Sequence, residues 1–315
     1  MRKFIAAPRA AVASAIVALA VLVYLSVHTG VVQDSRFGDE VFFISRLPRT
    51  LAVLLSGAGL AVGGLVMQMI VHNRFVEPNT TGTSEGAAIG LLISMIFFNQ
   101  WPLFARMGFA SLCAMLSMFV FIRLARALPF KDPLLLPLVG MIYAGILEAG
   151  MTFFAYQYEL LQVLQVWTNG DFSAVLNGRY EWLWGCALLI ALLYLLADQL
   201  SIIGMGEKAS HSLGLNYRQL VLIGILLVAM MTAFIVSTVG MIAFLGLLVP
   251  NIVRRFCGDH LRQALPWVAW TGAALLLLCD LLARTVNAPY EIPVSLIYGT
   301  LGSGLFLFLL LKRGA

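Results

Sequence analysis

Charged residues are scarce in this sequence. Only 11% of its 315 residues are Asp, Glu, Lys or Arg, whereas 61% are hydrophobic. Soluble domains carry about 25% charged residues, so the composition excludes a soluble globular domain. The mean hydropathy of +0.94 over the whole chain predicts a single polytopic transmembrane domain covering residues 1–315. The net charge of +5 then indicates membrane topology and not nucleic-acid binding.

Motifs for catalysis and cofactor binding are also missing. The sequence contains no GxxxxGK[ST] phosphate loop and no HExxH, CxxC or GxSxG motif. The four cysteines are far apart and show no metal-ligand spacing, and the four histidines fall at the ends of apolar runs (Cys113, Cys186, Cys257, Cys279; His28, His72, His211, His260). We therefore expect a chain that is not an enzyme and that binds no cofactor or metal of its own.

Ten apolar segments follow one another along the chain. A helix needs about 20 apolar residues to span a bilayer, and somewhat fewer inside a bundle. The segments are 10–27, 47–71, 87–98, 107–124, 134–154, 182–196, 220–239, 240–255, 264–282 and 290–311. The eighth is short and interrupted by Pro250. We predict an all-α fold of about ten transmembrane helices, the first of which is retained as a span and not removed as a signal peptide.

The distribution of basic residues orients this arrangement. With the N-terminus in the cytoplasm, 14 of the 20 basic residues fall on inner segments, and the other six fall on outer ones (Arg36, Arg46, Arg49, Arg106, Arg179, Arg284). Inner loops of membrane proteins carry the excess of Lys and Arg. The bias predicts that both termini are cytoplasmic.

The polar stretch 204–220 separates two of the longest apolar runs. It reads GMGEKASHSLGLNYRQL, and lipid could not satisfy its side chains. Ala209 to Leu213 can form a short helical turn, with Gly214 as its C-terminal stop. An ordinary cytoplasmic loop is one interpretation. The more specific interpretation is a docking element through which a soluble partner moves the membrane helices.

Residues 157–180 predict a different kind of polar segment. The stretch is amphiphilic and contains Trp167 and two Asn-Gly-type turns, so we expect an outer surface helix and not a span.

Glycine pairs and two intramembrane acids complete the candidates. Gly59 and Gly63 form one GxxxG pair and Gly82 and Gly86 another, which favours close helix packing. Glu148 and Asp280 are the clearest ionisable residues within spans, where an acid is a functional candidate. Asp280 precedes Arg284 by four residues, and an i,i+4 pair accounts for it. We interpret both acids as structural.

Several motifs together resemble the FecCD-type permeases, the membrane subunits of ATP-binding-cassette (ABC) importers for iron-siderophores, haem and vitamin B12. They occur in the family's order over nearly the whole chain: Arg46-Leu47-Pro48-Arg49, Asn73-Arg74-Phe75-Val76-Glu77-Pro78, Trp167 to Gly170, Gly206-Glu207 with Leu213-Gly214-Leu215, Gly240 to Pro250, and Glu291-Ile292-Pro293. Three positions depart from the family pattern. Asn251 replaces its usual His, Ser295 its usual Gly, and Gly302-Ser303-Gly304 its usual Gly-x-Pro. We interpret these as marks of a divergent branch that pairs two different permease chains, a homodimer being the other option.

The resemblance implies a fold like that of the vitamin B12 importer, in a bacterial inner membrane. It implies a second permease subunit, two cytoplasmic ATPase subunits and a periplasmic binding protein that delivers a ferric siderophore; haem and cobalamin are alternative cargoes. Residues of 204–220 would couple to the ATPase, and the glycine pairs and Pro250 would serve helix packing and gating. The coupling candidates are Glu207, Lys208, Leu213, Gly214 and Arg218.

Three outer arginines run against the charge bias, namely Arg46, Arg49 and Arg284. Snorkelling to lipid headgroups is one explanation. In the family these positions resemble the arginines that meet acidic residues of the binding protein, so we predict a docking role. The competing function for the whole chain is an ion-gradient-driven secondary transporter, which would show inverted repeats and buried acids near the middle of the membrane.

Overall fold

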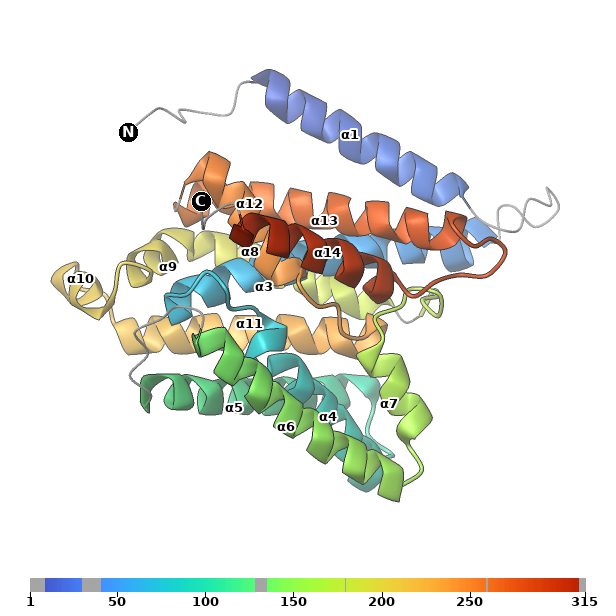
Figure 1. Cartoon of the computed structure of the whole chain (residues 1–315), viewed down its shortest axis with the longest axis horizontal. Helices are drawn as coiled ribbons and strands as arrows, with labels where there is room; N and C mark the ends of the chain where they lie inside the picture. The colour runs from blue at the N-terminus through green and yellow to red at the C-terminus, as the bar shows by residue number, and fades with distance from the viewer. Residues whose placement is uncertain (1–8, 30–40, 128–134, 179, 259, 312–315) are drawn as a thin grey trace.

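The computed structural model describes residues 9–29, 41–127, 135–178, 180–258 and 260–311. Within these ranges every regular element is a helix, so the all-α fold class is confirmed (Figure 1). The elements are α1 (Arg9–His28), η1 (Phe42–Arg46), α3 (Leu47–Val71), η2 (Pro78–Thr81), α4 (Thr83–Phe97), α5 (Leu103–Ala127), α6 (Leu135–Gln157), α7 (Leu161–Thr168), η3 (Tyr180–Leu183), α8 (Trp184–Leu195), α9 (Ala197–Ile203), α10 (Glu207–Ser212), α11 (Tyr217–Val239), α12 (Leu245–Cys257), α13 (Leu261–Thr285) and α14 (Val294–Leu311).

Each of the ten apolar segments coincides with a helix. Five of these helices, in the described part of the chain, are long and apolar enough to cross a membrane by themselves, and a bent pair makes a sixth. The others are α12 and three shorter apolar helices, so the count of ten crossings stays a prediction. The cytoplasmic placement of both ends also stays a prediction, because residues 1–8 and 312–315 lie outside the described ranges, as does most of the outer loop with Arg36.

The central helix is α3, and most of its side chains are buried. It packs against α13, α12 and α11. Glycines on two turns allow the closest approaches: a Cβ on Gly57 would lie 2.6 Å from the Gly272 carbonyl oxygen of α13, and one on Gly64 would lie 1.9 Å from the Gly246 oxygen of α12. The closest backbone contacts of α3 are therefore at Gly57 and Gly64, which the GxxxG pattern did not single out.

The glycines of the predicted pairs contact side chains more than backbone. Gly59 and Gly63 face Met231 of α11, and Gly86 faces Ser117 of α5. Gly82 has φ +69° and ends η2, where a Cβ would lie 2.6 Å from the Tyr143 ring. These positions pack elements together as expected, and their role in gating remains a prediction.

The sixth apolar segment ends at its predicted boundary, because α8 ends at Leu195 and α9 follows it at a 66° bend. The eighth segment differs from the sequence-based prediction. Pro250 does not interrupt the eighth segment, since α12 runs through it. A proline lacks the N–H that would bond the carbonyl four residues earlier, and here Gln68 Nε2 lies 3.4 Å from that Gly246 oxygen. The side chain of α3 thus replaces the missing backbone donor.

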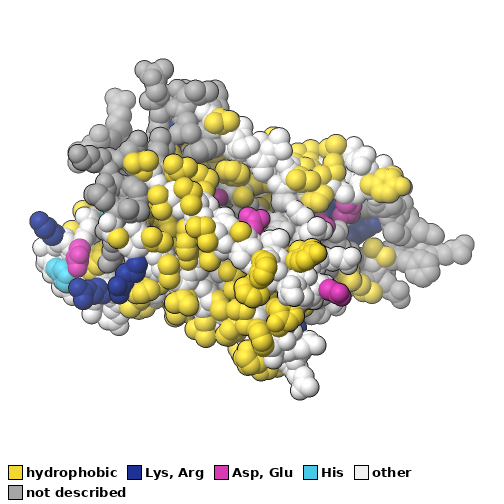
Figure 2. All heavy atoms as spheres, turned by 60° about the horizontal axis from the view of Figure 1, so that its bottom comes forward, with side chains coloured by type: hydrophobic (Ala, Val, Ile, Leu, Met, Phe, Trp, Pro, Cys, Tyr) yellow, Lys and Arg dark blue, Asp and Glu magenta, His cyan; other side chains and the backbone are white. Residues whose placement is uncertain are grey.

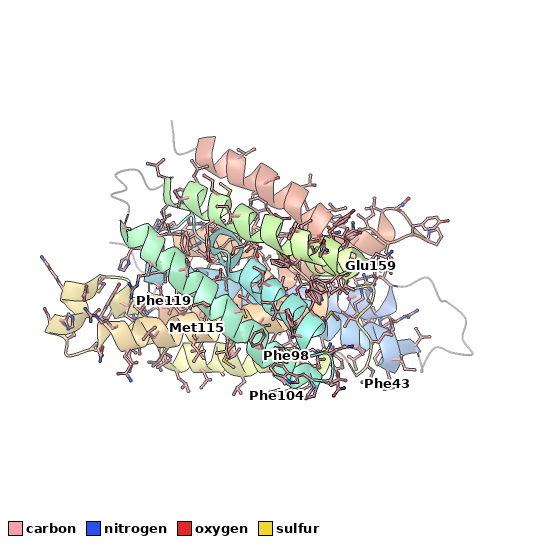
Figure 3. All side chains as sticks on the ribbon, turned by 90° about the horizontal axis from the view of Figure 1, so that it is seen from below. Phe43, Phe98, Phe104, Met115, Phe119 and Glu159 are labelled. Carbon is pink, nitrogen blue, oxygen red and sulfur yellow. The ribbon has the colours of Figure 1, made fainter. Side chains whose placement is uncertain are left out.

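The outer layer of the bundle is apolar. Hydrophobic side chains cover much of the face shown in Figure 2, while basic and histidine side chains gather at the end that carries α10. Phe104 and Phe119 on α5 are exposed, and Figure 3 shows them along one face of the molecule. Side chains of this kind on the outside of a helical bundle face lipid or another subunit.

Candidate functional site

The segment 204–220 forms a short helix that projects from one end of the bundle, opposite the end that carries α7 (Figure 1). Helix α10 begins at Glu207, two residues before the predicted turn, and Gly206 at φ +105° precedes it. Gly214 follows with φ +75°, a left-handed conformation that glycine adopts without strain. The predicted helix and its glycine stop are therefore present.

The surface of α10 combines one apolar side chain with polar neighbours. Leu213 is 62% exposed, and Glu207, Lys208 and Arg218 are exposed around it. The ring of His211 lies 3.7 Å from the Glu207 carboxylate one turn away. An exposed leucine within a charged rim is suited to a protein partner, and the coupling role of these residues stays a prediction.

At the opposite end, two of the three outer arginines join a buried ionic cluster. Arg49 donates to Asp280 Oδ1 from Nε (3.1 Å) and Nη2 (2.8 Å), and its Nη1 donates to Glu291 at 2.7 Å. Arg284 donates to Asp280 Oδ2 at 2.6 Å and to the Ser26 hydroxyl at 2.7 Å. The cluster connects α1, α3, α13 and the entry to α14, and it confirms the i,i+4 pairing of Asp280 with Arg284.

This burial constrains the predicted docking role. Arg49 and Arg284 are each 7% exposed, and their guanidinium groups bond inside the chain. Arg46 is half-buried and donates to the Val27 carbonyl oxygen. In this structure the most exposed part of the cluster is Glu291, whose side chain is 31% exposed. Arg46 and Glu291 are therefore more accessible than Arg49 and Arg284, and the docking role of the three arginines stays a prediction.

The family-like motifs converge at the first turn of α12. Glu77 is buried, and its carboxylate accepts the backbone N–H groups of Phe244 (2.8 Å) and Leu247 (3.1 Å). A carboxylate at a helix N-terminus satisfies N–H groups that lack partners within the helix and interacts favourably with the helix dipole. Burial raises the pKa of Glu77 to about 7, and these backbone hydrogen bonds oppose that shift. The sequence identified Glu77 only as part of a motif and not as the cap of α12.

The Trp167 to Gly170 motif pairs with the same region. The Met241 N–H donates to the Trp167 oxygen at 2.8 Å, and the Asp171 N–H donates to the Val239 oxygen at 2.9 Å. A Cβ on Gly170 would lie 2.5 Å from the Met241 oxygen, which explains the need for glycine. The non-helical stretch before α12 is thus bonded on both sides.

Asn251, which departs from the family pattern, has a defined structural role. Its Nδ2 donates to the Arg74 and Leu247 carbonyl oxygens, each at 2.7 Å. The amide therefore connects α12 to the loop after α3 without an imidazole.

The acids within the helices fall into three cases. Asp280 is paired, and Glu148 is exposed on α6. Glu85, which the sequence analysis did not single out, lies in the first turn of α4, and its buried Oε2 has no hydrogen-bond partner. Among the described residues no group of three or more His, Cys, Asp or Glu could hold a metal ion.

A cavity of about 430 Å³ lies at the end of the bundle that carries α7, between α7 and the adjoining ends of α5 and α11. Its polar side chains are amides, hydroxyls and one carboxylate, contributed by Gln162, Gln165, Asn169, Asp171, Ser173, Ser237 and Thr238. Such a lining can form hydrogen bonds with a ligand, and none of its described residues is a cation.

Comparison with known proteins gives a match over nearly the entire chain. The model of the FecCD transport family matches residues 10–312. The petrobactin import system permease protein YclN of Bacillus subtilis is 41% identical over 281 residues, covering 89% of each chain. The ferric-anguibactin transport system permease protein FatD of Vibrio anguillarum is 41% identical over 268 residues, covering 85% of each. The vitamin B12 import system permease protein BtuC of Escherichia coli is 36% identical over 284 residues, covering 88% of this chain and 85% of BtuC.

The fold has close relatives among solved structures. A transporter described as of the metal-chelate ABC type, in an inward-facing conformation, superposes with a TM-score of 0.81 and 27% identity, covering 97% of this chain and all of that one. PsaBC from Streptococcus pneumoniae gives a TM-score of 0.63 at 13% identity, covering 87% of this chain and 94% of that one, a likeness of fold alone.

Proposed function

The chain belongs to the FecCD transport family, and from this premise we propose that it is the membrane-spanning permease subunit of an ABC importer that carries a ferric siderophore across a bacterial inner membrane. The names of the relatives support the cargo, since two of those most like this chain import petrobactin and ferric anguibactin. The observation that carries the mechanism is α10, a short exposed helix at one end of a hydrophobic bundle.

The proposed assembly has three further subunits and a delivery protein. Two cytoplasmic ATPase subunits would contact α10, and a second permease subunit would complete the channel. The departures at Asn251 and Ser295 favour a second permease of different sequence. A periplasmic binding protein would dock at the outer end, where Arg46 is the most accessible of the three predicted docking arginines. In this assembly ATP hydrolysis occurs in the partner subunits.

The fold suggests how movement at α10 could reach the translocation path. The segment after α10 continues into α11, which packs on α3, α4 and α5. The non-helical stretch Gly240 to Phe244 separates α11 from α12 and is held by Glu77 and Trp167. Elements joined at such a break can tilt as rigid units. A push on α10 would then repack α11 against the helices around it.

The test is uptake into proteoliposomes that contain the permease pair and its ATPase. We expect uptake of the ⁵⁵Fe-loaded siderophore to require internal ATP and the loaded binding protein. Leu213→Asp should abolish uptake while the protein still inserts, because it places a charge on the apolar centre of the docking surface. The control is Ser212→Asp, which adds the same charge at the neighbouring exposed position at the end of α10. Wild-type uptake by Leu213→Asp would refute the coupling role.

A secondary transporter is the second candidate, and Glu85 is the observation that favours it. An acid with a buried carboxylate oxygen that accepts no hydrogen bond can take part in a proton path. This alternative predicts that uptake proceeds without the ATPase. It also predicts that uptake stops when an ionophore collapses the ion gradient. The ABC proposal predicts that the ionophore has no effect while ATP is supplied.

A further inference from the structure

Phe244, the residue before α12, has a backbone conformation that phenylalanine rarely adopts. Its φ is +67°, in the left-handed region, where a residue with a Cβ is strained and glycine is not. Phe244 is also the last residue of the non-helical stretch between α11 and α12. Strained residues persist where the surrounding structure holds them, and they are frequent in switch regions. The contacts of Phe244 therefore indicate whether this stretch can change its conformation.

Glu77 holds Phe244 through its backbone. The Glu77 carboxylate accepts the Phe244 N–H with Oε1 at 2.8 Å and the Leu247 N–H with Oε2 at 3.1 Å. Glu77 is buried, and a buried carboxylate is costly unless its oxygens accept hydrogen bonds. Phe244 can therefore leave its strained conformation at low cost only if another donor takes its place at Oε1.

A second buried polar group lies beside Phe244, on α14, which packs against α12 and α13. Tyr298 is 1% exposed, and its buried hydroxyl has no hydrogen-bond partner among the described residues. Gly302, one turn later, allows a close approach: a Cβ there would lie 3.2 Å from Phe244 Cβ and 3.5 Å from Tyr298 Cε1. Glu77 is close enough to interact electrostatically with the Tyr298 hydroxyl. The hydroxyl therefore lies near a carboxylate to which it is not bonded.

One rearrangement would satisfy both groups. A buried hydroxyl without a protein partner and a strained φ are each unfavourable. If Tyr298 donates to Glu77 Oε1, the carboxylate keeps the number of its donors while the Phe244 N–H is released. The φ of Phe244 can then return to a negative value, and its N–H can bond the carbonyl four residues earlier, as in a regular helix. The exchange of one donor for another thus leaves no buried oxygen of Glu77 unsatisfied.

We propose that the start of α12 is a two-state joint of the transport cycle, in which the Tyr298 hydroxyl replaces the Phe244 N–H at the Glu77 carboxylate. The structure shows the state in which Phe244 is bonded. In the other state the stretch between α11 and α12 has a different backbone conformation, and the two helices change their relative tilt. Tyr298 is thus a positioning residue for α12. This inference rests on the proposed function, because it assigns the second state to transport.

The first test is Tyr298→Phe, which removes only the hydroxyl. In nanodiscs without nucleotide the variant should unfold at the wild-type temperature or above it, because the hydroxyl has no protein partner in this state. Its ATP-driven uptake should fall about fivefold, the change in an equilibrium that one neutral hydrogen bond produces. The matched control is Tyr143→Phe, whose hydroxyl lies 3.1 Å from the Ser117 carbonyl oxygen, and which should unfold at a lower temperature.

The second test compares Phe244→Gly with Phe244→Ala. Both variants lose the same ring, so they differ in the backbone: alanine is strained at φ +67° and glycine is not. We expect Phe244→Gly to unfold at the higher temperature of the two. It should also show the slower uptake, because it stabilises the state in which Phe244 is bonded and leaves the other state less populated. Faster uptake by Phe244→Gly than by Phe244→Ala would overturn the joint.

The two readouts separate this inference from the proposed function. Thermal unfolding uses the permease alone, whereas uptake uses the assembled importer. Absence of ATP-driven uptake in the wild type would refute the proposed function. With uptake present in the wild type, an unchanged uptake rate in Tyr298→Phe would overturn the joint. A lower unfolding temperature together with slower uptake in Tyr298→Phe would also overturn it, since the hydroxyl would then stabilise the state that the structure shows.

Discussion

Removing the charge of Asp280 is the sharpest perturbation that the outer ionic cluster offers. Asp280 is fully buried and accepts from two arginines at once, with Oδ1 paired to Arg49 at 2.8 Å and Oδ2 to Arg284 at 2.6 Å. Asp280→Asn keeps the shape of the side chain and replaces one acceptor oxygen with an NH₂ donor. Among the described residues, the two buried guanidinium groups would then share only Glu291 as a charged partner.

The expected loss of stability is about 3–5 kcal/mol, the range observed when one partner of a buried ion pair is removed. Two other acid-to-amide substitutions provide comparisons for this loss of stability. Glu291→Gln affects the same Arg49, but the carboxylate is 31% exposed, so solvent compensates part of the loss. Asp198→Asn breaks the exposed pair with Arg262, where the acid is 48% exposed, and exposed pairs contribute about 0–1 kcal/mol. The expected order of destabilisation is Asp280→Asn, then Glu291→Gln, then Asp198→Asn.

The assay is thermal unfolding followed by thiol labelling, because Cys186 is fully buried and reacts only when the bundle opens. Cys113 and Cys257 are replaced by serine in all variants, since both are partly accessible, and Cys279 by alanine, since it neighbours Asp280. A loss of less than about 1 kcal/mol for Asp280→Asn, the size expected of an exposed pair, would refute the reasoning. It would mean that the cluster is hydrated and that Arg49 and Arg284 are available to a partner after all.

Three further changes test other parts of the structure. Glu77→Gln should destabilise the chain by about 1.5–3 kcal/mol, because one charge-assisted bond to the first turn of α12 is lost; equal thermal stability of variant and wild type would contradict this. Gly64→Ala should lower the free energy of unfolding by about 1–3 kcal/mol, since its Cβ would lie 1.9 Å from the Gly246 oxygen. Gly145→Ala has open space around it and should leave the stability unchanged in the same unfolding assay. Cysteine at Ser212 should label only from the cytoplasmic side and cysteine at Ser173 only from the outside, both positions being exposed; labelling of both from one face would exclude the proposed topology.

The helices themselves could be predicted because their signal is local. Apolar length locates every long helix within a few residues, and a polar stretch with a glycine after it predicts α10. Ser210 shows the limit of such reasoning. It lies in the polar segment and would serve as a labelling position by sequence, yet it is fully buried. On a six-residue helix the exposed face depends on how α10 sits against α9 and α11, and periodicity over so few residues does not determine that.

The pairing of helices could not be predicted, because it depends on which face of each helix meets a neighbour. GxxxG spacing selects Gly59 and Gly63, but α3 has small residues on several faces. The backbone contacts fall instead on Gly57 and Gly64, which are seven residues apart and meet glycines of two different helices. Those partners, Gly272 and Gly246, are more than 180 residues away in the sequence, so no local pattern contains them.

The outer arginines show how a correct motif can still leave the role of a side chain open. The charge bias predicts few arginines at outer helix ends. An arginine found there therefore suggests a partner outside the chain. The structure supplies a partner inside it, because Asp280 lies one turn before Arg284 and faces Arg49 across the α3–α13 contact. That contact is itself made possible by Gly57 and Gly272, which bring the two helices together. The small residues of the core and the charges at its outer end are therefore parts of one arrangement, and a docking role for Arg49 or Arg284 would require the cluster to open when the binding protein arrives.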